Sequence, residues 1–386
     1  MGDITGNDRR FNRADLARYS GDLGVVGGVR LVELADGVER GIRCLEFRTG
    51  TGLAFEVLVD RAMDIGAVEH AGRAVGWRSA TGFRHPGLHE HADDNGLSWV
   101  RSFSGLLVTA GLDHTLFPAE VDGSHYNYLP TVWQPLHGRI SNIPARLTGY
   151  GEQWTDEGCV LWAEGEVRQA RVFGEHLVLR RRIEADLGGN EIRLVDTVTN
   201  AGSDDTPHMQ LYHVNVGWPV LDEGSRFVAA VDGTRWCTAS VVDQGISYRT
   251  MPAPARGVAE QVYEHELATD TDGTRCVALL NDRLGLGFEM TWRADEFPCF
   301  FEWLHLREGA YAIGLEPSTH HVEGEEAARA DGSMTWLGAG ESRSYHTTFA
   351  VLDGADALSA SEARIRAVGG QPDDTTMAQR AAEVKA

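Results

Sequence analysis

The stretches HLVLRRRI (His176–Ile183) and EIRLVDTVTN (Glu191–Asn200) decide the fold of this chain. Both alternate apolar and polar residues with a period of two, as a β-strand does when one of its faces is buried. The glycine-rich turn Gly188–Asn190 lies between them. The sequence therefore predicts an antiparallel hairpin at this point.

Similar short runs, separated by turn residues, recur along most of the chain. They are Gly41–Arg48, Leu53–Val59, Val160–Trp162, Cys276–Asn281, Leu286–Thr291, Cys299–Leu306, Tyr311–Pro317 and Ser342–Leu352. Strands without intervening helices favour packed antiparallel sheets over a βαβ fold. We therefore expect an all-β protein built as one large antiparallel β-sandwich.

The predicted organisation has three parts. An N-terminal arm spans residues 1–24 and contains a short helix at Arg13–Tyr19. A single β-sandwich domain spans residues 25–352. Helical periodicity is strong only in the tail, residues 353–386, at Ala355–Val368 and Thr375–Val384.

Charge and composition exclude several classes of partner. The formal net charge is −22 over 386 residues. Such a surface repels phosphate backbones and anionic lipid, so neither a nucleic acid nor a membrane is expected. The five cysteines form no CxxC pair, which argues against a zinc knuckle or a disulfide framework. The N-terminus is polar, and no run approaches the ~18 apolar residues of a membrane span. We expect a cytoplasmic protein, and its oligomeric state stays open.

Four segments next to predicted strands are rich in polar and turn-forming residues. They are GLDHT (111–115), PLHGRISNIPA (135–145), TPHMQLYHVNVGWP (206–219) and YAIGLEPSTH (311–320). The third segment reads as a strand with His208 and Tyr212 on one face and His213 and Asn215 on the other.

Glu316 and His213 are the candidates for acid/base chemistry. Glu316 ends the apolar run YAIGL and precedes a proline, so its carboxylate should lie at the rim of a buried strand, where desolvation raises the pKa. His213 precedes the bend Asn-Val-Gly-Trp-Pro, so it should lie near a strand end, and an imidazole exchanges protons near neutral pH. The alternatives are a solvated strand-end carboxylate and a satisfied core histidine.

Other residues could bind a substrate. His137 and Arg139 lie close together between prolines and could hold hydroxyl groups by directed hydrogen bonds, or they could stabilise their own loop. Arg61 with Asp64 could contact a substrate, although a surface ion pair is the better interpretation. Five of the ten tryptophans could offer apolar platforms for sugar rings: Trp77, Trp99, Trp133, Trp218 and Trp303.

The order of these motifs resembles that of the aldose 1-epimerase, or galactose mutarotase-like, superfamily over roughly residues 25–352. The family motifs look like His137-Gly138, Tyr212-His213-Val214-Asn215 and Glu316-Pro317 in this chain. The segments VDRAMDI, GLDHT, LHGRISNIPA and GLEPSTH look like a poorly characterised bacterial branch. The resemblance implies a large twisted antiparallel β-sandwich with short C-terminal helices. The aromatic pair that follows the family's catalytic histidine is absent here, so the substrate cannot be carried over.

The activity that the resemblance implies is the interconversion of sugar anomers. Glu316 would be the base that takes the proton of the anomeric hydroxyl, and His213 the acid that protonates the ring oxygen. His137 and Arg139 would bind ring hydroxyls. Further substrate-binding residues are expected at Arg61, Asp113, His114, His208 and Asn215. The partner is a small-molecule sugar, and no metal or other cofactor is expected.

Two other functions fit the same residues. An isomerase, epimerase or lyase acting on a keto- or acidic sugar away from C1 would use the same pair, with a divalent metal to stabilise an enolate. The histidines show no HExxH spacing, so the metal signal is weak. A non-catalytic carbohydrate-binding protein could share the same fold.

Overall fold

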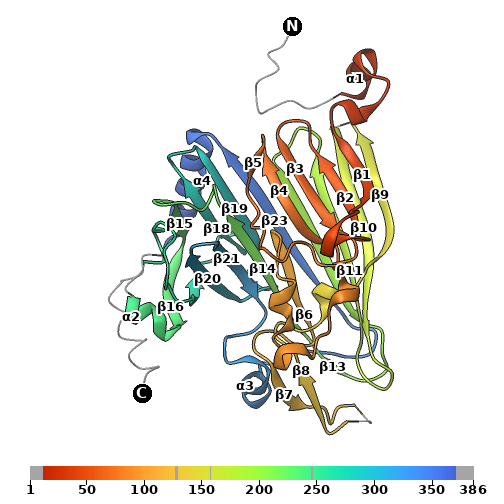
Figure 1. Ribbon diagram of the computed structural model, residues 1–386, viewed down its shortest axis with the longest axis vertical. Coiled ribbons are helices and arrows are strands. Elements are labelled where there is room, and N and C mark those ends of the chain that lie inside the picture. The colour runs from red at the N-terminus through yellow and green to blue at the C-terminus, as the bar shows by residue number, and fades with distance from the viewer. Residues whose placement is uncertain (1–11, 127–128, 157, 245–246, 371–386) are drawn as a thin grey trace.

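The computed structural model describes residues 12–126, 129–156, 158–244 and 247–370, and three antiparallel sheets dominate it (Figure 1). The five-stranded sheet has the order β1 (Gly28–Glu33), β2 (Arg43–Arg48), β3 (Leu53–Leu58), β4 (Asp64–His70) and β5 (Arg73–Ala74). The eight-stranded sheet has the order β15 (Arg226–Ala229), β18 (Thr274–Asn281), β19 (Leu286–Arg293), β23 (Ser342–Asp353), β12 (Glu191–Asn200), β11 (His176–Asp186), β10 (Gly158–Ala170) and β9 (Arg146–Thr155).

The six-stranded sheet carries the site described below. Its order is β16 (Val231–Cys237), β17 (Gln261–Leu267), β20 (Cys299–Arg307), β21 (Ala310–Ser318), β14 (Met209–Gly217) and β6 (Leu107–Leu112). Two short pairs join β7 (Ala119–Asp122) to β8 (Thr131–Gln134), and β13 (Thr206–Pro207) to β22 (Trp336–Leu337). The α-helices of the described residues are α1 (Arg13–Tyr19), α2 (Ala239–Gln244), α3 (Gly324–Asp331) and α4 (Ala355–Val368).

The predicted hairpin is confirmed, and it forms the middle of the eight-stranded sheet. Strand β11 pairs with β12 in the expected antiparallel register. Alternate residues of both strands, such as Leu179 and Leu194, are buried in the main hydrophobic core. The same period places Arg181 and Asp196 on this inner face, directly opposite each other. The alternation therefore buries a cross-strand ion pair as well as apolar side chains.

Arg181 connects all three sheets through its guanidinium group. It donates two hydrogen bonds to Asp196 of β12, at 2.8 and 2.7 Å, and one of 2.7 Å to Asp64 of β4. It also donates to the Thr109 hydroxyl of β6 at 2.8 Å. The Tyr212 hydroxyl of β14 donates to Asp196 at 2.6 Å. The side chain of Arg181 is fully buried, so this polar network fixes how the sheets lie on one another.

The fold prediction is confirmed: the protein is mostly antiparallel β-structure with a few short helices. Helices α1 and α4 have the predicted bounds, whereas Thr375–Val384 lies outside the described residues. Helix α4 lies beside the eight-stranded sheet (Figure 1). Its residues Leu358 and Ile365 pack with Ala278 and Leu280 of that sheet. Within the part of the chain that the structure describes, every helix falls short of the length and apolar character that a membrane span requires.

Candidate functional site

His213 and Glu316 face each other on neighbouring strands of the six-stranded sheet. The register pairs Leu211 of β14 with Ser318 of β21 and Val214 with Leu315, so His213 lies opposite Glu316. Tyr212 points toward the eight-stranded sheet, where it binds Asp196. Because side chains alternate along a strand, His213 points to the other face. Its Nε2 lies 3.1 Å from Glu316 Oε1.

The sequence placed both residues at strand ends, and this was wrong. His213 is in the middle of β14, and β21 continues through Pro317 to Ser318. Pro317 stays paired with Phe300 of β20, but it has no N–H to donate. The ladder between β14 and β21 has a gap at this point. The proline therefore loosens the contact between the two strands beside the pair rather than ending the strand.

Burial governs the protonation of this pair. Both residues are only 4% exposed. Desolvation raises the pKa of Glu316 well above its ordinary value of 4.5, and the nearby Glu260 charge raises it further. Desolvation lowers the pKa of His213 well below its ordinary value of 6.5. Both shifts favour the uncharged forms of the pair, a carboxylic acid beside a neutral imidazole.

Asn215 fixes the tautomer of His213. The Asn215 amide nitrogen donates to the backbone carbonyls of Gly105, at 3.1 Å, and His213, at 3.0 Å. The amide oxygen must therefore face His213 Nδ1, which lies 2.6 Å away. Since that oxygen only accepts, the proton of a neutral imidazole is on Nδ1. The Nε2 atom that faces Glu316 is then a free base.

The His137-Gly138 turn brings a third polar side chain to the pair. Both residues have positive φ, at 57° and 73°. A Cβ atom at Gly138 would overlap the carbonyl oxygen of Gly111 and lie 2.6 Å from that of His114, so only glycine fits. The His137 ring lies 5.6 Å from the His213 ring, centroid to centroid. Desolvation, followed by the His114 charge, lowers the pKa of His137 to about 3.

Gly314 leaves room for the pair. A Cβ atom at this position would overlap Glu316 Oε1 and lie 3.0 Å from His213 Cε1 and 3.1 Å from Trp303 Cβ. Gly314 therefore matters because it leaves space that a side chain would fill, and not because of an unusual backbone conformation. Any larger residue would push the two catalytic candidates apart.

The pair opens into a cavity of about 310 Å³. Six aromatic side chains line it: Trp99, Phe103, Phe117, Trp236, Phe301 and Trp303. Six aliphatic ones join them: Leu97, Val100, Leu116, Leu136, Val262 and Val322. The polar lining consists of His137, His213, Thr238, Glu260 and Glu316. The volume lies at the lower end of the range of about 300–1,000 Å³ that small-molecule sites occupy.

Three polar atoms of the cavity residues lack a hydrogen-bond partner among the described residues. They are Trp99 Nε1, His137 Nδ1 and Glu316 Oε1. The contact of Glu316 Oε1 with His213 is close but is not aligned as a hydrogen bond. Buried polar atoms are rarely left unpaired. A ligand bound in the cavity would be near enough to pair with these three atoms.

The other predicted substrate-binding residues do not line the cavity. Arg61 donates to three backbone carbonyls, of Ser141, Arg84 and Ser102. Arg139 donates to the Gln134 side chain and the Trp133 carbonyl, and it lies 3.6 Å from Asp113. The protein's own acceptors therefore occupy both arginines, and their binding of substrate stays a prediction.

Asp113, His114 and His208 are likewise held by the protein. Asp113 accepts hydrogen bonds from Gln134 and Gln169. His114 contacts Glu325 at 3.0 Å and the Phe117 carbonyl at 2.8 Å. His208 contacts the Leu112 carbonyl and the Tyr345 hydroxyl from the opposite face of β14. Asn215 acts on His213 and does not line the cavity.

Aromatic residues form much of the wall around His213. Trp99, Phe103 and Trp303 lie 5.6, 4.6 and 5.3 Å from its ring, centroid to centroid. Of the five tryptophans predicted as platforms, Trp99 and Trp303 line the cavity, whereas Trp77, Trp133 and Trp218 do not. Phe103, Trp236, Thr238 and Glu260 were missed, because no local pattern distinguishes them from core or loop residues.

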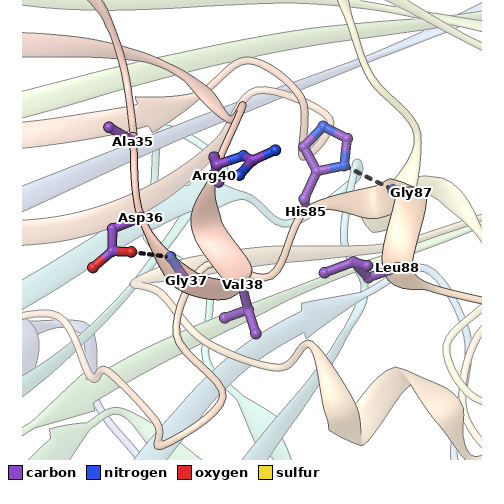
Figure 2. A pocket seen from close by; sticks show the side chains of 8 residues that line it. All are labelled: Ala35, Asp36, Gly37, Val38, Arg40, His85, Gly87 and Leu88. Carbon is purple, nitrogen blue, oxygen red and sulfur yellow. Dashed lines mark hydrogen bonds between the residues drawn. The ribbon is translucent and has the colours of Figure 1, made fainter.

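A second, wider hollow of about 580 Å³ lies where two short 3-10 helices meet, at Gly37–Glu39 and Pro86–Leu88. Figure 2 shows its lining, with Arg40, His85 and Leu88 among the labelled side chains. Asp36 and His85 accept hydrogen bonds from the backbone N–H groups of Gly37 and Gly87. Both side chains therefore cap their own helices, and this hollow is the weaker candidate.

Glu264, Cys299 and His321 form the group of three metal-type donors found among the described residues. The Cys299 sulfur lies 3.3 Å from His321 Nδ1, and Glu264 contacts the same nitrogen. Arg235 lies 3.0 Å from the other oxygen of Glu264 and balances its charge. None of the three lines the cavity, so this group is separate from the pair of His213 and Glu316.

We predict that Asn215→Ala lowers the kcat of an acid/base reaction at His213 and Glu316 about tenfold or more. The KM of that reaction should change little. The substitution removes the acceptor that holds the His213 tautomer, and one net hydrogen bond of about 1–1.5 kcal/mol corresponds to that factor. The imidazole ¹⁵N signals of His213 should then report a mixture of tautomers. Asn281→Ala is the matched control, since Asn281 is also buried but binds the Pro219 carbonyl far from the pair. An equal loss of kcat in both variants would contradict the positioning role.

Comparisons with known proteins add the family and the fold. The sequence profile of a family described as "Domain of unknown function (DUF4432)" matches residues 39–351. No curated protein sequence matches the chain. A solved structure from Klebsiella pneumoniae, provisionally named an aldose 1-epimerase, is similar with a TM-score of 0.80 and 22% identity, over 89% of this chain and 88% of that one.

Two further solved structures are more distant. A galactose mutarotase-like protein from Clostridium acetobutylicum has a TM-score of 0.56 at 11% identity, over 84% of this chain and 98% of that one. A galactose 1-epimerase from Lactobacillus acidophilus has a TM-score of 0.51 at 11% identity, over 84% and 99%. At these identities the likeness shows the fold, which is that of the galactose mutarotase-like proteins.

Proposed function

The chain belongs to the DUF4432 family, whose description assigns no reaction, and we propose that it is an isomerase that interconverts the two anomers of a sugar. One observation carries the proposal: His213 Nε2 and Glu316 Oε1 lie 3.1 Å apart at the wall of a cavity of about 310 Å³. An unpaired acid and an unpaired base at one point are what a hemiacetal needs for ring opening. The similar structures named as aldose and galactose 1-epimerases support the same reaction.

The proposed reaction moves two protons and breaks one bond. His213 Nε2 takes the proton of the anomeric hydroxyl while Glu316 gives its proton to the ring oxygen, and the bond between C1 and the ring oxygen breaks. The open form has a carbonyl at C1, and rotation about C1–C2 turns its other face toward the ring oxygen. On closure Glu316 takes its proton back from that oxygen, and His213 returns its own to the carbonyl oxygen. No net proton is lost or gained.

These starting roles are the reverse of those expected from the sequence. The resemblance made Glu316 the base and His213 the acid. Burial raises the pKa of Glu316 and lowers that of His213, so the resting proton belongs on the carboxyl group. Because anomer exchange is reversible, each group acts as both acid and base in every cycle.

Proton NMR of the purified protein with a panel of aldoses, ketoses and uronates tests the function. We expect exchange cross-peaks between the α and β anomers of at least one sugar, at a rate that grows with protein concentration. Deuterium uptake at a carbon, or new stereochemistry away from C1, would instead indicate an isomerase that removes a carbon-bound proton. Binding without any exchange would contradict catalysis and leave a carbohydrate-binding protein.

We also predict the charge state of the pair. His213 should stay neutral below pH 6.5, with its proton on Nδ1, because desolvation lowers its pKa. The exchange rate should fall at low pH as His213 gains a proton and the base is lost. It should fall at high pH as Glu316 loses its proton and the acid is lost, since its pKa is raised. ¹⁵N NMR of the imidazole as pH is varied measures this directly, and a charged His213 at pH 7 would contradict the neutral pair.

A further inference from the structure

We propose that the cavity selects uncharged sugars with an apolar group in place of a hydroxyl, such as 6-deoxyhexoses, and rejects sugar acids and sugar phosphates. The inference rests on the proposed function and concerns the substrate class of the same site. Three features carry it: the charges that line the cavity, the positions of the arginines, and the shortage of polar partners.

The lining contains two acidic side chains, Glu260 and Glu316, and no lysine or arginine. Glu316 is buried, which raises its pKa, whereas Glu260 is exposed and lies just before β17. The charge of Glu260 is felt inside the cavity, since it raises the pKa of Glu316. An anionic substrate would meet this negative charge on entry. Like charges placed together disfavour binding.

The two arginines expected from the sequence to bind substrate are occupied elsewhere. Carboxylates and phosphates are usually held by the paired N–H donors of arginine. Arg61 directs its donors at three backbone carbonyls, and Arg139 binds Gln134 and the Trp133 carbonyl beside Asp113. Neither arginine lines the cavity.

The wall offers few partners for hydroxyl groups. Twelve of the seventeen residues that line the cavity are apolar. Once His213 and Glu316 serve C1 and the ring oxygen, the remaining polar groups in the lining are His137, Thr238, Glu260 and the unpaired Trp99 Nε1. A hydroxyl group buried without a partner is penalised. A methyl group at the same place would pack against the aromatic rings instead.

Three sugars that differ only at C6 provide the test: 6-deoxy-D-galactose, D-galactose and D-galacturonate carry a methyl, a hydroxymethyl and a carboxylate group there. The corresponding D-gluco and L-manno series are run beside them. We expect kcat/KM for anomer exchange to fall in that order within the series that is accepted. The step from methyl to hydroxymethyl should be about tenfold, the size of one unpaired hydroxyl group. The carboxylate should react more slowly still.

Glu260→Gln gives an internal check. Removing the charge should raise the kcat/KM of the uronate relative to its neutral partner about fivefold, as expected for one like charge acting through water. Glu266→Gln is the control: it changes the net charge equally from an exposed position on β17 outside the cavity, and the ratio should not move.

Different results would overturn the substrate preference and the proposed function. The inference about charge is overturned if uronates are exchanged as fast as the neutral sugars. It is also overturned if Glu260→Gln leaves the kcat/KM of the uronate relative to its neutral partner unchanged. Neither result contradicts anomer exchange itself. If the hydroxymethyl sugars exceed the 6-deoxy sugars in every accepted series, the apolar selection is overturned. If no sugar of the panel is exchanged, the proposed function itself is overturned.

Discussion

Glu316→Gln should slow anomer exchange by about 10²- to 10⁴-fold, the usual contribution of general acid/base catalysis. Glutamine keeps the shape of the side chain but cannot give up or take back a proton. The carboxyl group is buried against His213 and lacks a hydrogen-bond partner among the described residues. The substitution should therefore leave the folded structure intact. Exchange rates by NMR and thermal unfolding curves measure the two effects.

The protein contains a matched control for this variant. Glu302 of β20 is fully buried, lies 3.0 Å from His265, and has a pKa raised by the same desolvation. It does not line the cavity. Glu302→Gln should thus leave the exchange rate within about threefold of wild type, whatever its effect on stability. Near-normal exchange in Glu316→Gln, or an equal loss in both variants, would refute the role of Glu316.

Arg181→Met should lower the free energy of unfolding by about 3–5 kcal/mol, the range found when one partner of a buried ion pair is removed. The substitution leaves two buried carboxyl groups, Asp64 and Asp196, without their cation. Burial already raises the pKa of Asp64 even with Arg181 beside it. Urea unfolding of the purified protein gives the free energy. The variant should also lose the packing of the three sheets that Arg181 connects.

The neighbouring residue provides the comparison for this stability effect. Arg180 lies on the same strand but faces solvent, where it binds Glu164 with a side chain that is 63% exposed. An exposed ion pair is worth about 0–1 kcal/mol. Arg180→Met should therefore change the unfolding free energy by no more than that. If Arg181→Met falls within the same range, the three-sheet network does not hold the fold together.

The positions of the strands could be predicted from the sequence because they depend on the local alternation of apolar and polar residues. The run from Glu191 to Asn200 has the period of a half-buried strand, and the structure has that strand. The same alternation puts Arg181 and Asp196 at inward positions, which predicts a buried ion pair once the hairpin register is assumed. The contact between Arg181 and Asp64 could not be predicted from the sequence, since the two residues are 117 positions apart.

The candidate site was predicted in part for a similar reason. His137, His213 and Glu316 belong to short motifs in a recognisable order, and all three line the cavity. The partners of the arginines could not be predicted because they depend on tertiary contacts: Arg61 donates to the carbonyl of Ser141, 80 residues away. The aromatic wall was only partly visible, because a tryptophan on a cavity and one in the core have the same sequence pattern.

Gly314 contributes to the proposed acid/base motif through the side chain that it lacks. Its missing Cβ atom is what lets the carboxyl group of Glu316 and the ring of His213 meet. A sequence search that asks only for the acid and the base would also accept chains in which alanine or valine fills this position. Those chains should keep the fold but lack the close contact between the acid and the base. Reading the motif as Gly-x-Glu-Pro would therefore select the chains that have room for this contact.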